Sequence, residues 1–407
     1  MNIKRFENDK FKTNEIALFL TMPLRKETIT MNALIPMILR RGSKNYPNQL
    51  LISKKLENLY GAGFNCGIDK SADYCVLKFY IETVANKYLP NNEDLTQEAI
   101  NMLMDIVFNP LVVNEGFDKD YVQQEKENLC KIIDARKDDK QAYAFNRCIE
   151  EMFKDQPYGI YKFGSKEDLN NINEKNLYEY YKKMIEECRC DIFINGIDAN
   201  KVEINDDRKA NYCDIKEIKE TEKSEKTLEK DCKEKVVNET MNVVQGKLVI
   251  GLNAKYENKF AISMYNAILG GGANSKLFQN VREKASLAYS AGSRYIRRKD
   301  SIFIITGIEL KNYDKALKII KEQLVEMKEG NITDKEFLDA KQLVLSTLKL
   351  IPESQEDMIS FDFDQDLFKE NLSFEQYYEN IERITKEDVI KAAQAISINT
   401  IYYLKND

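Results

Sequence analysis

The chain has 407 residues, of which 43 % are hydrophobic, and its formal net charge at pH 7 is -6. This length and apolar content favour two or more domains, while the acidic balance without a basic tract excludes nucleic acid and anionic membranes as natural partners. Because no apolar run approaches membrane-spanning length and the first residues lack the apolar core of a secretory signal, we expect a cytoplasmic protein.

The first half of the sequence alternates apolar strand patterns with longer helical patterns. It opens with a predicted buried strand over residues 15–22 and a helix over 30–41, whose end is marked by Gly42. The remaining elements expected in this half are helix 48–60, strands 64–68 and 74–83, helices 93–108, 117–135, 141–153 and 174–187, and strand 191–195.

A charged segment then separates this half from a second one. Between Cys213 and Asn238, Lys and Glu dominate and large apolar residues are few, as is typical of a solvated linker or an exposed hairpin. The same order of elements begins again after it, with strand 247–253, helices 259–269 and 275–284, strands 287–296 and 301–309, helices 313–329, 334–349 and 388–396, and strand 400–404.

Local similarities support an internal duplication. Residues 117–121 resemble 333–337, residues 172–177 resemble 384–389, and the nearly equal offsets give a repeat of about half the chain. We therefore predict an α+β fold of two homologous domains, each a mostly antiparallel sheet with helices packed on one face, arranged as a clam-shell. The expected boundaries are an N-terminal domain over 1–205, a charged linker over 206–240 and a C-terminal domain over 241–407.

Several common kinds of active site are excluded by composition. The chain contains no histidine, which removes Ser-His and Cys-His triads, His-ligated zinc and imidazole acid–base catalysis. Its eight cysteines lie between Cys66 and Cys232 without a CxxC pair, a scatter that favours reduced thiols over a disulfide framework or a zinc knuckle.

Two ligand motifs are begun but not completed. The segment 270–276 lacks the second glycine that a phosphate-binding P-loop places before its lysine, because Ser275 stands there. Alternate aspartates from Asp362 to Asp366 begin like a calcium loop, but Leu367 occupies its required glycine position. We interpret both segments as solvated faces or helix caps.

One stretch, from Leu269 to Gly292, has the composition of a binding site. A run of three glycines, Gly270, Gly271 and Gly272, would let the backbone approach another chain closely. Arg282 precedes Tyr289 by seven residues, so on a helix both would lie on one face and could grip an extended peptide. Alternatively, the glycines only let a helix pack against a strand, and the Arg/Tyr pair is ordinary packing.

The motifs of this stretch carry a family resemblance. Five short motifs together resemble the pitrilysin/insulinase-type zinc metallopeptidases. Four follow one another in the second half, namely Gly270-Gly271-Gly272, Leu277-Phe278, Arg282-Glu283-Lys284 and Leu287-Ala288-Tyr289, and the fifth, Arg41-Gly42-Ser43, follows the first long helix. The similarity covers nearly the whole chain. Within the family, the chain resembles more closely the subunits of mitochondrial processing peptidase and the small, zinc-less YmfF-like bacterial members.

The resemblance also implies that the zinc site is lost. The two histidines of the family's inverted motif, H-x-x-E-H, correspond to Ala33 and Met37, its glutamate base to Pro36, and its third ligand to Ile132. None of these side chains can bind zinc or activate water. The cysteines of this half match no zinc spacing, so we expect the chain to bind no cofactor and a partner subunit to hold the zinc.

By the same resemblance, Arg282 and Tyr289 would contact substrate beside the zinc of a partner. A guanidinium can bind peptide carbonyls, and a phenol can donate to an oxygen that becomes negative when water attacks. The first hypothesis is therefore a non-catalytic, substrate-binding subunit of a heterodimeric zinc peptidase, which holds an extended peptide and can pair with itself when purified alone. The second is a non-enzymatic scaffold or peptide-binding module of the same fold.

Overall fold

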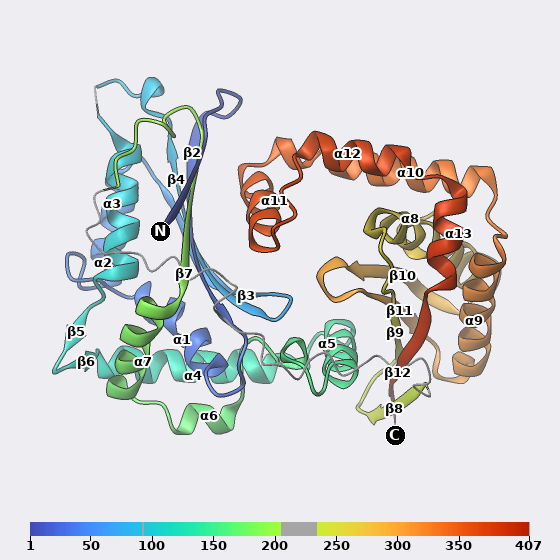
Figure 1. The fold of residues 1–407 in the computed structure, drawn as a ribbon. Helices are drawn as coiled ribbons and strands as arrows, with labels where there is room; N and C mark the ends of the chain where they lie inside the picture. The colour runs from blue at the N-terminus through green and yellow to red at the C-terminus, as the bar shows by residue number, and fades with distance from the viewer. Residues whose placement is uncertain (92, 205–233, 407) are drawn as a thin grey trace. The chain divides into compact units, whose positions relative to one another are not determined.

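The computed structural model describes residues 1–91, 93–204 and 234–406, and these build two compact units (Figure 1). Of these residues, the first unit holds 1–135, 156–204 and 354–367, and the second holds 136–155, 234–353 and 368–406. Most of the expected linker lies outside the described residues. Its last part, Lys235–Thr240, is strand β8 rather than a solvated connection.

The first unit is built on a five-stranded sheet in the order β1-β7-β2-β4-β3. Strand β1 runs parallel to β7, and every other neighbouring pair is antiparallel. The N-terminal residues, for which no element was predicted, form β1. The bounds of the strands are β1 Asn2–Phe6, β2 Thr13–Pro23, β3 Gly63–Ser71, β4 Tyr74–Val84 and β7 Arg189–Asn195, and a separate hairpin consists of β5 Val112–Val113 and β6 Gly116–Phe117.

The sheet of the second unit repeats this topology. Its order is β10-β11-β9-β12-β8, with β8 parallel to β12 and all other neighbours antiparallel. Order and direction coincide when β8 is matched with β1, β12 with β7, β9 with β2, β11 with β4 and β10 with β3. This confirms the predicted α+β fold of two similar domains. The remaining bounds are β9 Gly246–Asn253, β10 Ala288–Ile296, β11 Ser301–Ile308 and β12 Ser397–Lys405.

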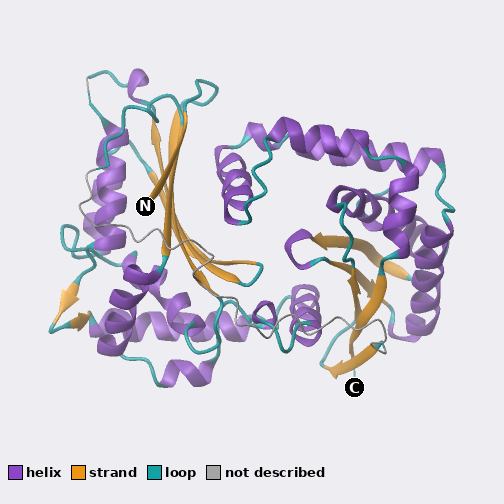
Figure 2. Ribbon diagram, viewed as in Figure 1, coloured by secondary structure: helices purple, strands orange, loops and turns teal. Residues whose placement is uncertain are grey.

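Helices cover the sheets of both units (Figure 2). No helix among the described residues is long and apolar enough to span a bilayer. The helices of the first unit are α1 Ile29–Leu39, α2 Gln49–Asn58, α3 Leu95–Phe108, α4 Lys119–Ala135, α6 Lys166–Asn170, α7 Glu174–Glu187 and α11 Gln355–Leu367. Those of the second are α5 Lys140–Met152, α8 Lys259–Gly270, a π-helix over Phe278–Lys284, α9 Tyr313–Glu329, α10 Asp334–Leu348, α12 Phe374–Arg383 and α13 Lys386–Gln394.

The sequence similarities that indicated duplication lie at helix starts. Asp118 accepts a hydrogen bond from the Tyr121 amide at the start of α4, and Thr333 and Glu336 form a capping box at the start of α10. Capping boxes also begin α7, at Asn173, and α13, at Thr385. A cap satisfies the backbone amides at a helix start that have no partner within the helix. The short polar cap patterns therefore recur in both halves, where they are easier to recognise than similarities between the two cores.

Each unit also receives one helix from the other half of the sequence. Helix α11 packs on the first sheet through Phe363, whose ring lies 4.8 Å from that of Phe19, and α5 packs on the second sheet through Phe145, 5.3 Å from Phe303. The expectation that Asp362 to Asp366 form a solvated face was wrong. They lie within α11, where Asp362 accepts a hydrogen bond from Lys4 at 2.6 Å.

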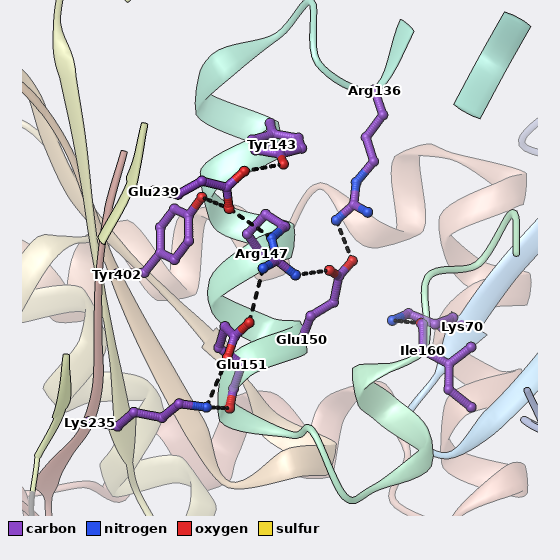
Figure 3. Close-up of polar contacts among 10 residues, drawn as sticks. All are labelled: Lys70, Arg136, Tyr143, Arg147, Glu150, Glu151, Ile160, Lys235, Glu239 and Tyr402. Carbon is purple, nitrogen blue, oxygen red and sulfur yellow. Dashed lines mark hydrogen bonds and ion pairs between the residues drawn. The ribbon is translucent and has the colours of Figure 1, made fainter. Parts of the chain in front are cut away.

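A polar network fixes α5 to the second sheet (Figure 3). The Glu239 carboxylate on β8 accepts hydrogen bonds from Tyr143 and Arg147 of α5, at 2.5 and 3.1 Å, and from Tyr402 of β12 at 2.8 Å. Burial by itself would raise the pKa of Glu239, but these bonds outweigh it and hold the pKa below its ordinary value. The network therefore holds α5 against strands β8 and β12.

Candidate functional site

The positions expected for zinc ligands lie on α1 and α4, which pack against each other. Ala33 is 2 % exposed and packs in the core, Pro36 is a buried proline within α1, and Met37 packs against the same core. Ile132 on α4 is 37 % exposed. These side chains offer no ligand atom suited to zinc, and no three His, Cys, Asp or Glu side chains of the described residues are grouped so that they could hold a metal ion.

Two cysteines near α1, Cys66 and Cys75, are held as thiols. Burial raises the pKa of Cys66 to about 11, and Cys66 donates a hydrogen bond to the backbone oxygen of Pro36 at 3.3 Å. Burial likewise raises the pKa of Cys75 to about 12. A metal binds the thiolate form, so these pKa values oppose metal binding at neutral pH. The residues present do not fit a zinc ion.

The three glycines in the second half end helix α8, and none of them has a positive φ. A Cβ at Gly270 would meet the backbone nitrogen of Ser293 at 2.5 Å and the carbonyl carbon of Gly292 at 2.8 Å. A Cβ at Gly272 would meet only the end of the Leu343 side chain, at 3.1 Å. Gly270 therefore allows α8 to approach β10 closely, which is the packing role considered as the alternative from sequence.

Arg282 lies in the π-helix that follows the glycines. Its guanidinium stacks on the ring of Phe278, with its carbon 4.5 Å from the ring centre, and 42 % of its side-chain surface is exposed. Such stacking orients the guanidinium, whose Nε also lies 3.7 Å from the exposed Glu283 carboxylate. Short π-helical segments are rare and are frequently found at functional sites.

Tyr289 is not on the same helix as Arg282, so the prediction of a shared helical face was wrong. The π-helix ends at Lys284, and Tyr289 lies at the start of strand β10. In the register, Ala288 pairs with Ile308 of β11 and Ser290 pairs with Gly307, which makes Tyr289 the extra residue of a β-bulge. A bulge redirects a side chain, and the Tyr289 side chain is 79 % exposed.

Arg282 and Tyr289 nevertheless line one surface hollow of about 470 Å³. Gly270 lines it as well, whereas Gly271 and Gly272 do not. The hollow follows β10, which is the outermost strand of its sheet. The structure thus brings together a guanidinium, a phenol and the edge of a sheet. The other residues that line the hollow are Gln141, Phe278, Ser290, Ala291, Gly292, Ser293 and Ile305.

A buried ion pair holds the segment between the glycines and the π-helix. Lys276 is 6 % exposed, and its ammonium lies 2.9 Å from the Glu336 carboxylate and donates to the Asn331 carbonyl at 2.8 Å. Burial favours a raised pKa for Glu336, but hydrogen bonds from Thr333 and Lys276 lower it below the ordinary value. Lys276 is a positioning residue, because it fixes the start of the segment that carries Arg282.

Sequence analysis missed several residues of this site. Phe278 precedes Arg282 by four residues, a spacing that places side chains side by side on a helix and could have identified the stacked pair. Lys276 was noticed only in a failed P-loop comparison. Gln141 comes from α5, far away in sequence, and no local pattern predicts that it lines the hollow.

Comparisons with known proteins identify the family of the chain. A family model described as "Peptidase M16 inactive domain" matches residues 171–344. The chain is 33 % identical to "Probable inactive metalloprotease YmfF" of Bacillus subtilis, over 98 % of this chain and 94 % of that protein.

Solved structures share the whole fold. A conserved protein from Enterococcus faecalis is 26 % identical and superimposes with a TM-score of 0.85, covering 100 % of this chain and 96 % of its own. A peptidase M16 inactive domain from Pseudomonas fluorescens, 16 % identical, has a TM-score of 0.75 over 98 % of this chain and 95 % of its own. This second likeness concerns the fold alone.

Proposed function

The chain belongs to the M16 family of pitrilysin/insulinase-type peptidases as a homologue of its inactive members, and on this premise we propose that it is the non-catalytic, substrate-binding subunit of a two-chain zinc peptidase. A homologous subunit with intact ligands would hold the zinc and activate water. This chain would supply Arg282, Tyr289 and the glycine segment that shapes their surroundings.

The observation that carries the proposal is the exposure of Arg282 and Tyr289 in a single hollow. A mostly exposed phenol on a bulge and a half-exposed guanidinium contribute little to a core. Both are suited to a peptide, because a guanidinium binds carbonyl oxygens and a phenol donates to an oxygen that gains charge. Stacking on Phe278 and the buried Lys276 pair would keep the guanidinium in place.

The substrate class follows from the chemistry of these groups. Backbone carbonyls are common to all peptides, so the pair would select for an extended backbone rather than for one side chain. We expect the peptide to add as a strand to a sheet edge of the catalytic partner, which requires an unfolded or short substrate.

The test is coexpression with a homologous chain that contains H-x-x-E-H, followed by copurification and a peptide cleavage assay. Arg282→Ala should leave assembly intact and lower the turnover about a hundred-fold to a thousand-fold, as expected for one lost oxyanion donor. Tyr289→Phe should also lower turnover, because only its hydroxyl is removed. Lys284→Ala, in the same π-helix and exposed, is the matched control and should retain normal turnover.

Metal analysis of the isolated chain and of the complex should find zinc in proportion to the partner only. Size measurement of the isolated chain would show whether it pairs with itself. The proposal fails if the isolated chain holds one tightly bound zinc and cleaves peptide, or if both substitutions leave the rate of the complex unchanged.

A scaffold or peptide-binding module is the second candidate, and the contact of Gly270 with β10 favours it. Because helix packing accounts for this glycine, substrate binding is not needed to explain it. A scaffold would still assemble with its partner, but Arg282→Ala and Tyr289→Phe would not change cleavage. The same assay therefore separates the two functions.

A further inference from the structure

Strand β10 continues beyond the hollow that Arg282 and Tyr289 line, and it carries a further exposed charge, Arg294. Alternate residues of a strand face opposite sides of the sheet. Ala291 belongs to the core that includes α8, and Tyr295 packs against that core. Arg294, next to Tyr295, therefore faces the other side of the sheet. Its guanidinium lies there, 5.7 Å from the centre of the Phe145 ring on α5.

The hollow opens on the same side of the sheet. In the register, Arg294 pairs with Phe303, and two residues earlier Gly292 pairs with Ile305, which lines the hollow. Gln141 of α5 lines it too, four residues before Phe145 and thus on the same side of that helix. The hollow and Arg294 therefore follow one another along β10, on the face that α5 covers.

Arg294 has no counter-charge in the part of the chain that the structure describes. Its side chain is exposed, and no ion pair or hydrogen bond there involves its guanidinium. The Phe145 ring orients this group but carries no negative charge. Arg282, by comparison, has the Glu283 carboxylate 3.7 Å from its Nε. A guanidinium without a carboxylate beside it is suited to bind one from a ligand.

We propose that Arg294 determines substrate specificity, by binding an acidic side chain of the peptide that Arg282 and Tyr289 hold. Ser290, which lines the hollow, and Arg294 are four residues apart on β10, so about 14 Å separates them. An extended peptide covers this distance in about four residues. The inference rests on the proposed function and adds a substrate class to it, namely extended peptides with Asp or Glu about four residues from the carbonyl bound at Tyr289.

The test measures peptide binding by the isolated full-length chain. The chain contains no tryptophan, so the fluorescence of a single Trp in a peptide reports binding without background from the protein. Three capped, otherwise uncharged peptides of about nine residues carry a central Trp, with Glu, Gln or Lys at both ends, about four residues from it. Both ends are changed because a peptide can run in either direction along a strand.

The Glu peptide should bind about twofold to fivefold more tightly than the Gln peptide at low salt, as expected for an exposed ion pair, and the Lys peptide should bind more weakly than the Gln peptide. Salt at about 0.5 M should remove these differences, because it screens exposed charges.

Variants assign the preference to Arg294. Arg294→Gln should make the Glu and Gln peptides bind alike, Arg294→Glu should make the Lys peptide bind most tightly, and Arg294→Lys should keep the preference for Glu. The matched control is Lys391→Glu, an exposed residue of α13, which packs on α8 and α9. It changes the net charge as much as Arg294→Glu does and should keep the preference for Glu.

The inference and the proposed function can fail separately. Equal binding of the three peptides, a preference for Glu that persists in Arg294→Glu, or no saturable binding of any peptide up to about 1 mM would overturn the role of Arg294. Arg282→Ala should weaken binding of all three peptides and leave the preference for Glu. The proposed function is decided by the cleavage rates of the two-chain complex, in which Arg294 need not be changed.

Discussion

Replacing Gly270 by alanine tests whether the glycine run serves packing. The added Cβ would lie 2.5 Å from the Ser293 nitrogen and 2.8 Å from the Gly292 carbonyl carbon, and these backbone atoms cannot rotate away. Overpacking of this kind typically destabilises by roughly 1 to 3 kcal/mol. This cost is partly offset, by about 0.5 to 1 kcal/mol, because alanine restricts the backbone of the unfolded chain more than glycine does. The net loss therefore lies between about 0 and 2.5 kcal/mol, with a central value of about 1 kcal/mol.

For a unit of this size a loss of about 1 kcal/mol should lower the melting temperature by about 2 to 4 °C, which calorimetry of the full chain can measure. Gly272→Ala is the matched control, because its Cβ meets only the movable end of Leu343 and no backbone atom. It should be neutral or slightly stabilising. If the two variants melt alike, α8 does not depend on Gly270 for its approach to β10, and the glycines regain a functional explanation.

Two further substitutions test the electrostatics. Burial, with Glu356, Glu82 and Asp357 nearby, raises the pKa of Glu15 from 4.5 to about 7, so its stabilising contribution is present below pH 4.5 and is lost as the pH rises through 7. Glu15→Gln should remove this fall from melting curves taken between pH 4.5 and 8, and an unchanged slope would contradict the assignment. Lys276→Met should destabilise by roughly 1 to 3 kcal/mol, because Glu336 loses its buried counter-charge. The exposed Lys284→Met should not, and equal unfolding midpoints for the two would show that the pair is dispensable.

Periodicity and capping explain how far the sequence predicted the fold. Most helices and strands have strong 3.6- or 2-residue patterns, and the repeated caps at Asp118 and Thr333 identified the duplication. Helix α11 was missed because alternate aspartates obscured its apolar face. Two of these aspartates pair with basic residues of the first sheet, Asp362 with Lys4 and Asp366 with Arg189, and such distant partners leave no local signal.

The site was predicted by residue type but not by geometry. Arg282 and Tyr289 were selected by the family resemblance and by a helical spacing that the structure does not contain. A bulge at Tyr289 depends on how β10 pairs with β11, and strand pairing is a tertiary property that seven residues of sequence cannot specify. The hollow also needs Gln141 from the exchanged helix α5, which only the folded unit brings to β10.

The degenerate zinc positions of the first unit and the Arg282/Tyr289 hollow of the second differ in what folding alone explains. On α1, Ala33, Pro36 and Met37 all pack in or against the core, so each is accounted for by stability, and restoring imidazoles there would place polar rings against that core. Gly270 is likewise explained by its contact with β10. Tyr289 and Arg282 are different: one stands exposed on a bulge, the other is half exposed on a π-helix, and neither is needed to fill a core. A scaffold would tolerate many residues at those two positions, so the strongest distinction between a substrate-binding subunit and a scaffold lies in the hydroxyl of Tyr289 and the guanidinium of Arg282.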